Sequence, residues 1–151
     1  MATTEQTLRE DLQNAIRARD EVRLATLRMV LAAVQKEQVA GDVARQLEGD
    51  ELQAVLRREA KKRREAATAF EEAGRPDRAE RERAELAVVE GYLPAQLDDE
   101  QLAALVAAAI AETGAEGPRA MGQVMKVVTG SVAGRADGRR VSAEVRRQLA
   151  G

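Results

Sequence analysis

The chain has 151 residues, a single-domain length, and its 24 basic and 26 acidic side chains leave a net charge of −2. This near balance excludes a histone-like polycation and a solvating acidic tail as descriptions of the whole chain. Cysteine and histidine are absent, which excludes disulfides, thiol chemistry and the usual general base. One tyrosine, one phenylalanine and no tryptophan also exclude a base-stacking surface built from several aromatic rings.

Two helices are expected in the first forty residues. Apolar residues at helical spacing predict the first over about 4–19, and Asp20 is a candidate N-cap for the second, over about 21–40. More than half of the circumference of the second helix is apolar, which is typical of the buried centre of a bundle. Arg23 and Arg28 interrupt that surface, and we expect them to pair with acids of neighbouring helices such as Glu85.

The next pair of helices is marked by glycine and proline. Residues 41–49 are expected to form a loop, and Asp50 with Gln53 resembles a capping box at the start of a helix over about 51–73. Pro76 suits the first turn of a fourth helix that reaches about residue 91.

Pro94 lies in a break that we interpret as a domain boundary, with residues 1–93 before it and residues 94–151 after it. Asp98 and Gln101 form a second capping-box pattern, Pro118 is expected to start the next helix, and Asp137 is a candidate N-cap for the last. The predicted fold class is all-α, with an N-terminal helical bundle of about four helices and a C-terminal three-helix domain.

No catalytic site is identifiable. Ser131 and Ser142 have no histidine to activate them, and Glu82 and Glu85 lie among arginines that favour salt bridges over a metal. We therefore expect no catalytic residues, no metal and no cofactor. The polar N-terminus and the longest uncharged run, residues 101–111, indicate a cytoplasmic protein with no membrane partner.

A basic run over residues 57–64 holds six cations, opposed only by Glu59. Arg57, Lys61 and Arg64 fall on one helical face, which could follow the phosphates of a nucleic acid. Composition alone favours the alternative, a solvated face neutralised by nearby glutamates.

A second basic feature begins at Arg119, where seven cations against two acids give this region a net charge of +5. Arginines around the turn at 134–138 are placed to converge on an anion, whereas Arg146 and Arg147 could equally complement a helix dipole. From the two features together, the candidate nucleic-acid-binding residues are Arg119, Lys126, Arg135, Arg139, Arg140, Lys61, Lys62 and Arg64.

An ordered set of short motifs resembles the YqeY-like family, which shares its domain with the tail of the B subunit of glutamyl/aspartyl-tRNA amidotransferase. The resemblance covers essentially the whole chain. The motifs that carry it are Lys61-Lys62-Arg63-Arg64-Glu65, Gly74-Arg75-Pro76-Asp77, Glu85, Tyr92-Leu93-Pro94-Ala95-Gln96-Leu97, Met121-Gly122-Gln123-Val124-Met125 and Gly134-Arg135-Ala136-Asp137-Gly138.

The resemblance implies a non-catalytic accessory protein that binds tRNA, or assists a tRNA-modifying or aminoacylation-related protein, through its basic C-terminal domain. Two alternatives stay open. One is a protein-interaction module that does not bind RNA. The other, implied by the resemblance, is carbon–nitrogen ligase activity with glutamine as amido donor, as part of a larger complex.

Overall fold

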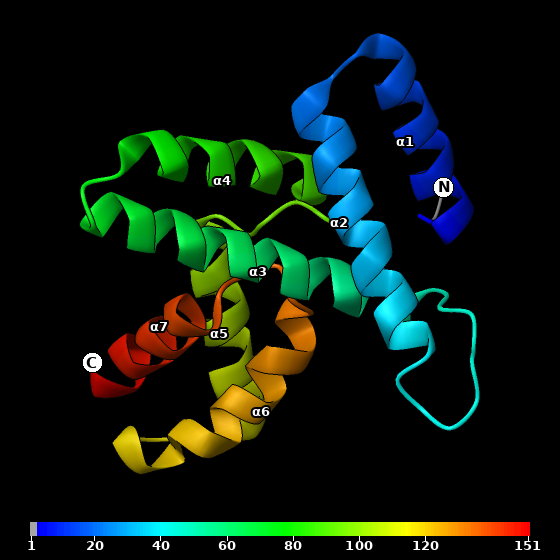
Figure 1. Cartoon of the computed structure of the whole chain (residues 1–151). Coiled ribbons are helices and arrows are strands. Elements are labelled where there is room, and N and C mark those ends of the chain that lie inside the picture. The colour runs from blue at the N-terminus through cyan, green and yellow to red at the C-terminus, as the bar shows by residue number, and fades with distance from the viewer. Residues whose placement is uncertain (1–2) are drawn as a thin grey trace. The chain divides into compact units, whose positions relative to one another are not determined.

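The computed structural model describes residues 3–151 and confirms the all-α prediction, because this part of the chain contains helices and no strands (Figure 1). None of these helices combines the length and the apolar character needed to cross a membrane. The elements are α1 (Glu5–Ala18), α2 (Glu21–Gln38), α3 (Asp50–Glu72), α4 (Pro76–Glu90), α5 (Asp99–Thr113), a single 3-10 turn η1 (Pro118–Ala120), α6 (Met121–Val132) and α7 (Gly138–Ala150).

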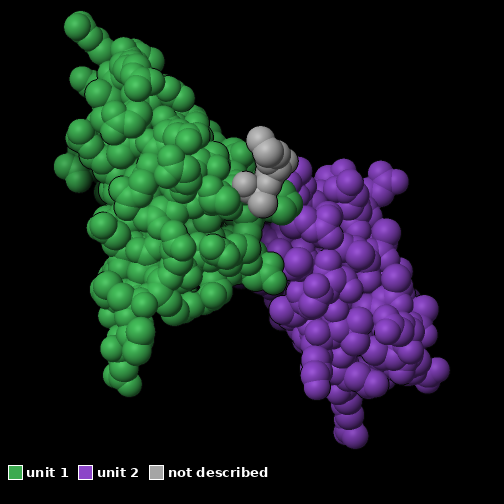
Figure 2. Space-filling model, turned by 90° about the vertical axis from the view of Figure 1, so that its right-hand side faces the viewer, with its two compact units in different colours: residues 1–94 green, residues 95–151 purple. Residues whose placement is uncertain are grey.

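The chain divides into two compact units, Met1–Pro94 and Ala95–Gly151, coloured separately in Figure 2. The first unit contains α1 to α4, and the second contains α5 to α7 together with η1. Each unit buries its own set of apolar side chains, and we describe each by itself.

In the first unit, α1 packs against α2, α3 packs along α4, and α2 also contacts both α3 and α4. Figure 1 shows the two helix pairs as hairpins. Leucines and valines fill the core, and Leu47 joins it from the connection between α2 and α3, where it is 1% exposed. Burial of Leu47 anchors a connection whose other residues are exposed.

The two arginines of α2 behave differently from one another. Arg23 donates from Nη2 to the hydroxyl of Tyr92 at 3.0 Å, and the same atom lies 3.7 Å from Asp11 Oδ2. Arg28 is exposed, so the expectation of a buried pair is wrong for this residue. Glu85, its suggested partner, is instead bound by Arg63 and Arg81.

In the first unit, the helix starts follow the sequence signals with one exception. Asp20 caps α2 by accepting from the amide of Arg23, as predicted. The predicted capping box at Asp50 and Gln53 is wrong, because Gly49 (φ 53°) occupies the N-cap and Asp50 is already helical. This moves Gln53 one position too far along the helix for a box, and its side-chain amide donates to the carbonyl of Tyr92 instead.

In the second unit, α5, α6 and α7 pack pairwise against one another. The capping box formed by Asp98 and Gln101 is confirmed, and so is the N-cap role of Asp137 on α7. Pro118 starts the short turn η1, and α6 itself begins three residues later. The backbone amide of Leu97 donates to the carbonyl of Arg135 at 2.7 Å, which ties the start of this unit to the connection between α6 and α7.

Candidate nucleic-acid interface

The eight candidate residues are divided between the two units. Lys61, Lys62 and Arg64 lie on α3 in the first unit, and the other five lie in η1, α6, α7 or the connection before α7 in the second. The two groups are therefore separate surfaces, and we assess each by the partners of its charged atoms.

The three candidate cations of α3 each lie near a glutamate. Lys62 Nζ lies 3.4 Å from Glu59 Oε2, Arg64 Nη2 lies 4.0 Å from Glu90 Oε2, and Lys61 Nζ lies 4.0 Å from Glu65 Oε1. Because the cation of each pair reaches solvent, we expect such pairs to contribute about 0–1 kcal/mol each. They nevertheless reduce the field that this face presents to a polyanion.

Arg63 does not belong to that surface at all. Its side chain is 5% exposed and lies between α3 and α4. Nη1 donates to Glu59 Oε1 at 3.1 Å, and Nε donates to Glu85 Oε1 at 3.3 Å. Of the six cations in this run, at least this one is therefore buried.

Glu82 and Glu85 do not form a metal site in the structure. Glu85 is buried and its two carboxylate oxygens accept from Arg63 and Arg81, so the salt-bridge interpretation of Glu85 is confirmed. Across residues 3–151, no group of three or more acidic side chains is arranged to hold a metal ion.

In the second unit, two of the candidate arginines have intramolecular partners. The side chain of Arg135 donates to the carbonyls of Val132 and Ser131, both at 3.2 Å, and so adds hydrogen bonds to the last carbonyls of α6. Arg140 donates to the carbonyl of Leu97 at 2.9 Å and to Asp99 Oδ1 at 3.0 Å. These two guanidinium groups hold chain segments together.

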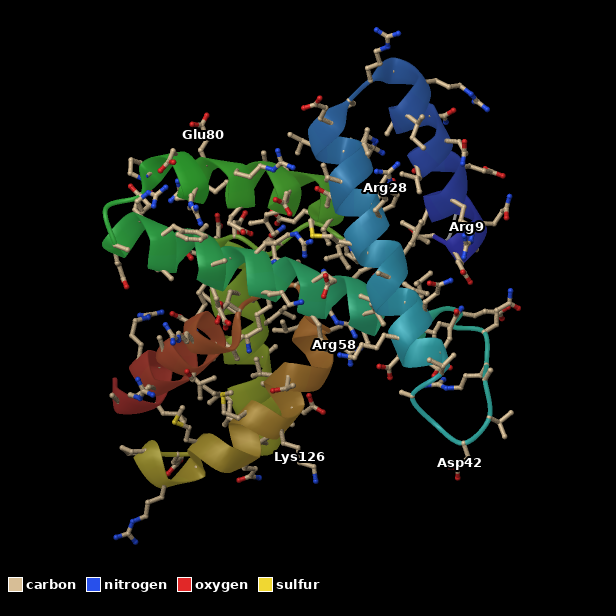
Figure 3. The ribbon with its side chains drawn as sticks, in the orientation of Figure 1. Arg9, Arg28, Asp42, Arg58, Glu80 and Lys126 are labelled. Carbon is tan, nitrogen blue, oxygen red and sulfur yellow. The ribbon has the colours of Figure 1, made fainter. Side chains whose placement is uncertain are left out.

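The other three candidates of this unit present their charge to solvent. Arg119, Lys126 and Arg139 are exposed, and within residues 3–151 no carboxylate lies within ion-pair distance of them. Figure 3 shows Lys126 extending away from the ribbon of α6. The short turn that carries Arg119 packs against both α6 and α7.

Helix α7 carries two pairs of arginines, and each pair lies seven residues apart and therefore on one face. Arg140 and Arg147 form the first pair, and both are neutralised: Arg140 by Asp99, and Arg147 by Glu144. Hydrogen bonds from Arg147, and from Gln148, lower the pKa of Glu144 to about 2, so this carboxylate is charged at neutral pH.

The second pair on α7 is Arg139 and Arg146, both exposed and both without an ion-pair partner in the described part of the chain. We call this pair the free arginine stripe. Arg146 was counted in the basic region from the sequence, but it was not predicted to be a site residue. The seven-residue spacing from Arg139 could have indicated that Arg146 shares its face. The same spacing relates Arg140 to Arg147, so only the positions of the acids distinguish the free arginine stripe from the neutralised pair.

The exposed face of α6 has two glycines, one on either side of Lys126. It carries Gly122, Lys126 and Gly130, and a Cβ added to either glycine would meet no atom within 4 Å. Glycine costs roughly 0.5–1 kcal/mol relative to alanine inside a helix. No packing within the second unit compensates for that cost.

The acids of the second unit are segregated from these cations along the chain. Five of its seven acidic residues lie before Arg119, on or next to α5: Asp98, Asp99, Glu100, Glu112 and Glu116. The net charge of the unit is therefore zero, but its first part is acidic and its second part is basic.

Two comparisons of the whole sequence with known proteins bear on its family. No protein in a search of curated proteins matches the sequence. A family model described as Yqey-like protein matches residues 5–149, nearly the full length. The chain is therefore a member of the YqeY-like family.

Proposed function

We propose that the protein binds tRNA, as a non-catalytic accessory protein, through the basic part of its C-terminal three-helix domain. The observation that carries the proposal is a set of exposed cations on η1, α6 and α7 that have no ion-pair partner among residues 3–151: Arg119, Lys126, Arg139 and Arg146. Cations that have no carboxylate partner are the ones able to replace counterions on a phosphate backbone.

The mode of recognition follows from what the surface lacks. The only aromatic residues of the chain, Phe70 and Tyr92, both lie in the first unit. The second unit therefore offers cations for phosphate contacts but no ring on which a base could stack. We infer that it reads the shape and backbone of a folded RNA and not its base sequence.

The test is a binding titration of the full chain with purified tRNA, measured by filter retention at several salt concentrations. Four phosphate contacts predict a slope of log K against log salt on the order of −3 to −4. Absence of detectable binding at low salt would overturn the proposal.

The two arginine pairs of α7 supply a matched control on one helix. Replacing Arg139 and Arg146 together by glutamine is expected to weaken binding roughly tenfold and to make the salt slope less negative by about 2. The same double change at Arg140 and Arg147 removes equal charge from neutralised positions, so we expect a much smaller loss. Because Arg140 also donates to the carbonyl of Leu97, both variants are first checked for an unchanged circular dichroism spectrum. Equal losses in two folded variants would show that binding follows net charge and not this surface.

A further inference from the structure

The first unit contains a groove that the proposed function does not use. It lies between α2, α3 and α4 and has a volume of about 420 Å³. Its lining residues are Met29, Ala32, Ala33, Lys36, Glu59, Lys62, Arg63, Ala66, Glu82 and Glu85. A volume of this size is within the range of small-molecule sites.

The buried guanidinium of Arg63 lines this groove, and one of its nitrogens lacks a strong hydrogen-bond acceptor. Nε and Nη1 donate to Glu85 and Glu59, but the only acceptor that Nη2 finds in the described part of the chain is Met29 Sδ, at 3.7 Å. A thioether sulfur is a weak acceptor. Met29 also lines the groove, so Nη2, whose N–H groups have only this weak acceptor, lies on the side of the guanidinium that faces the groove.

The charges around Arg63 favour one further negative charge. Each of the two buried glutamates accepts a hydrogen bond from Arg63 and also pairs with a second cation: Glu59 lies within ion-pair distance of Lys62, and Glu85 accepts from Arg81. Three cations therefore share two carboxylates. Lys36 adds a cation with no carboxylate within ion-pair distance among residues 3–151. The lining itself holds three cations and three acids, and Arg81 beside it brings the cations to four against Glu59, Glu82 and Glu85.

The rest of the lining is apolar and small. Met29 is 42% exposed, and Ala32, Ala33 and Ala66 add only methyl groups, which leaves room for an aliphatic chain. Methionine adapts to the shape of apolar ligands. The groove thus combines a strong donor, a positive charge and an apolar wall.

We propose that this groove binds a small monocarboxylate with a short aliphatic chain. The carboxylate accepts from Arg63 Nη2 and is attracted by Lys36, and the chain covers Met29 and the alanines. This assignment is independent of RNA binding, because it uses only residues of the first unit.

The probe is hexanoate, titrated into the full chain labelled with carbon-13 on its methionine methyl groups. Only the Met29 signal should shift and saturate, while the signals of Met121 and Met125, in the second unit, stay in place. Uncharged 1-hexanol should bind at least roughly tenfold more weakly, because it lacks the charge-assisted hydrogen bond. No saturable shift, or an equal response to both compounds, would overturn the proposal.

Variants that leave Arg63 intact keep the test independent of folding. Ala32→Phe fills the groove and should abolish the hexanoate response with the melting temperature unchanged. Lys36→Gln should weaken binding roughly threefold. Arg28→Gln, on the same helix and outside the groove lining, should have no effect. Undiminished binding by Ala32→Phe would overturn the proposal.

Discussion

Arg63 differs from the other cations of α3 because its charge is used inside the protein. It lies between two buried carboxylates, and removing one partner of such a cluster strands uncompensated charge in a medium of low polarity. We expect Arg63→Ala to lower the free energy of unfolding by about 3–5 kcal/mol, measured by urea denaturation.

The matched control is Arg81→Ala, which removes a guanidinium from the same carboxylate, Glu85, at a half-exposed position. Solvent screens this pair, so its loss should cost less than about 1 kcal/mol. Similar costs for the two substitutions would contradict the burial of Arg63.

Tyr92 connects three segments of the first unit through its hydroxyl. It donates to Asp11 and accepts from Arg23, and burial, followed by the hydrogen bond to Asp11, raises the pKa of the Tyr92 hydroxyl well above its usual value near 10. Tyr92→Phe should cost about 1–3 kcal/mol at neutral pH, because both charged groups lose a partner.

The raised pKa of Tyr92 also fixes the sign of a pH dependence. Above pH 10 the unfolded chain releases the tyrosine proton while the folded chain retains it, so the stability due to Tyr92 decreases as pH rises. Urea denaturation at pH 8 and pH 11 should show the difference between wild type and Tyr92→Phe becoming smaller. A difference that stays constant with pH would contradict the predicted shift.

Among the elements, helix existence was the most predictable property and helix starts were less so. The patterns at Asp20, Asp98 and Asp137 identified N-caps correctly, because a short acceptor side chain at that position accepts from a free backbone N–H of the first turn. Asp50 had the same pattern, but Gly49 adopts a left-handed backbone and begins the helix one residue earlier. Local sequence does not decide between two adjacent starts that are close in energy.

Two glycines of the second unit should respond to alanine with opposite sign. Gly130 is helical and has open space around it, so Gly130→Ala should stabilise the unit by roughly 0.5–1 kcal/mol. Gly114 ends α5 with φ 65°, so Gly114→Ala should destabilise it by about 1 kcal/mol. Thermal unfolding followed by circular dichroism measures both. If Gly130→Ala destabilises the unit, α6 has packing that the structure does not show.

At the scale of the whole molecule, the charges could be counted from the sequence, but their partners could not. Arg64 and Arg119 look equivalent in a list of cations, and only the fold reveals that Arg64 lies near Glu90 of another helix, while Arg119 has no acid within ion-pair distance among residues 3–151. The groove beside Arg63 was missed for the same reason, since its residues come from three helices. Contacts between distant segments depend on packing, which periodicity within one helix does not specify.

The separate cores of the two units predict that they unfold in separate transitions. The cores share no residue, and the single tyrosine, with no tryptophan in the chain, makes intrinsic fluorescence a reporter of the first unit alone. Val128 is fully buried in the second unit, and Val128→Ala should destabilise that unit by about 2 kcal/mol. The variant should therefore lower the midpoint of part of the circular dichroism transition in urea and leave the fluorescence midpoint of Tyr92 unchanged. Val34→Ala, in the first core, is the matched control and should lower the fluorescence midpoint. If Val128→Ala lowers both midpoints equally, the chain unfolds as one cooperative unit, and its division into two independently stable parts is wrong.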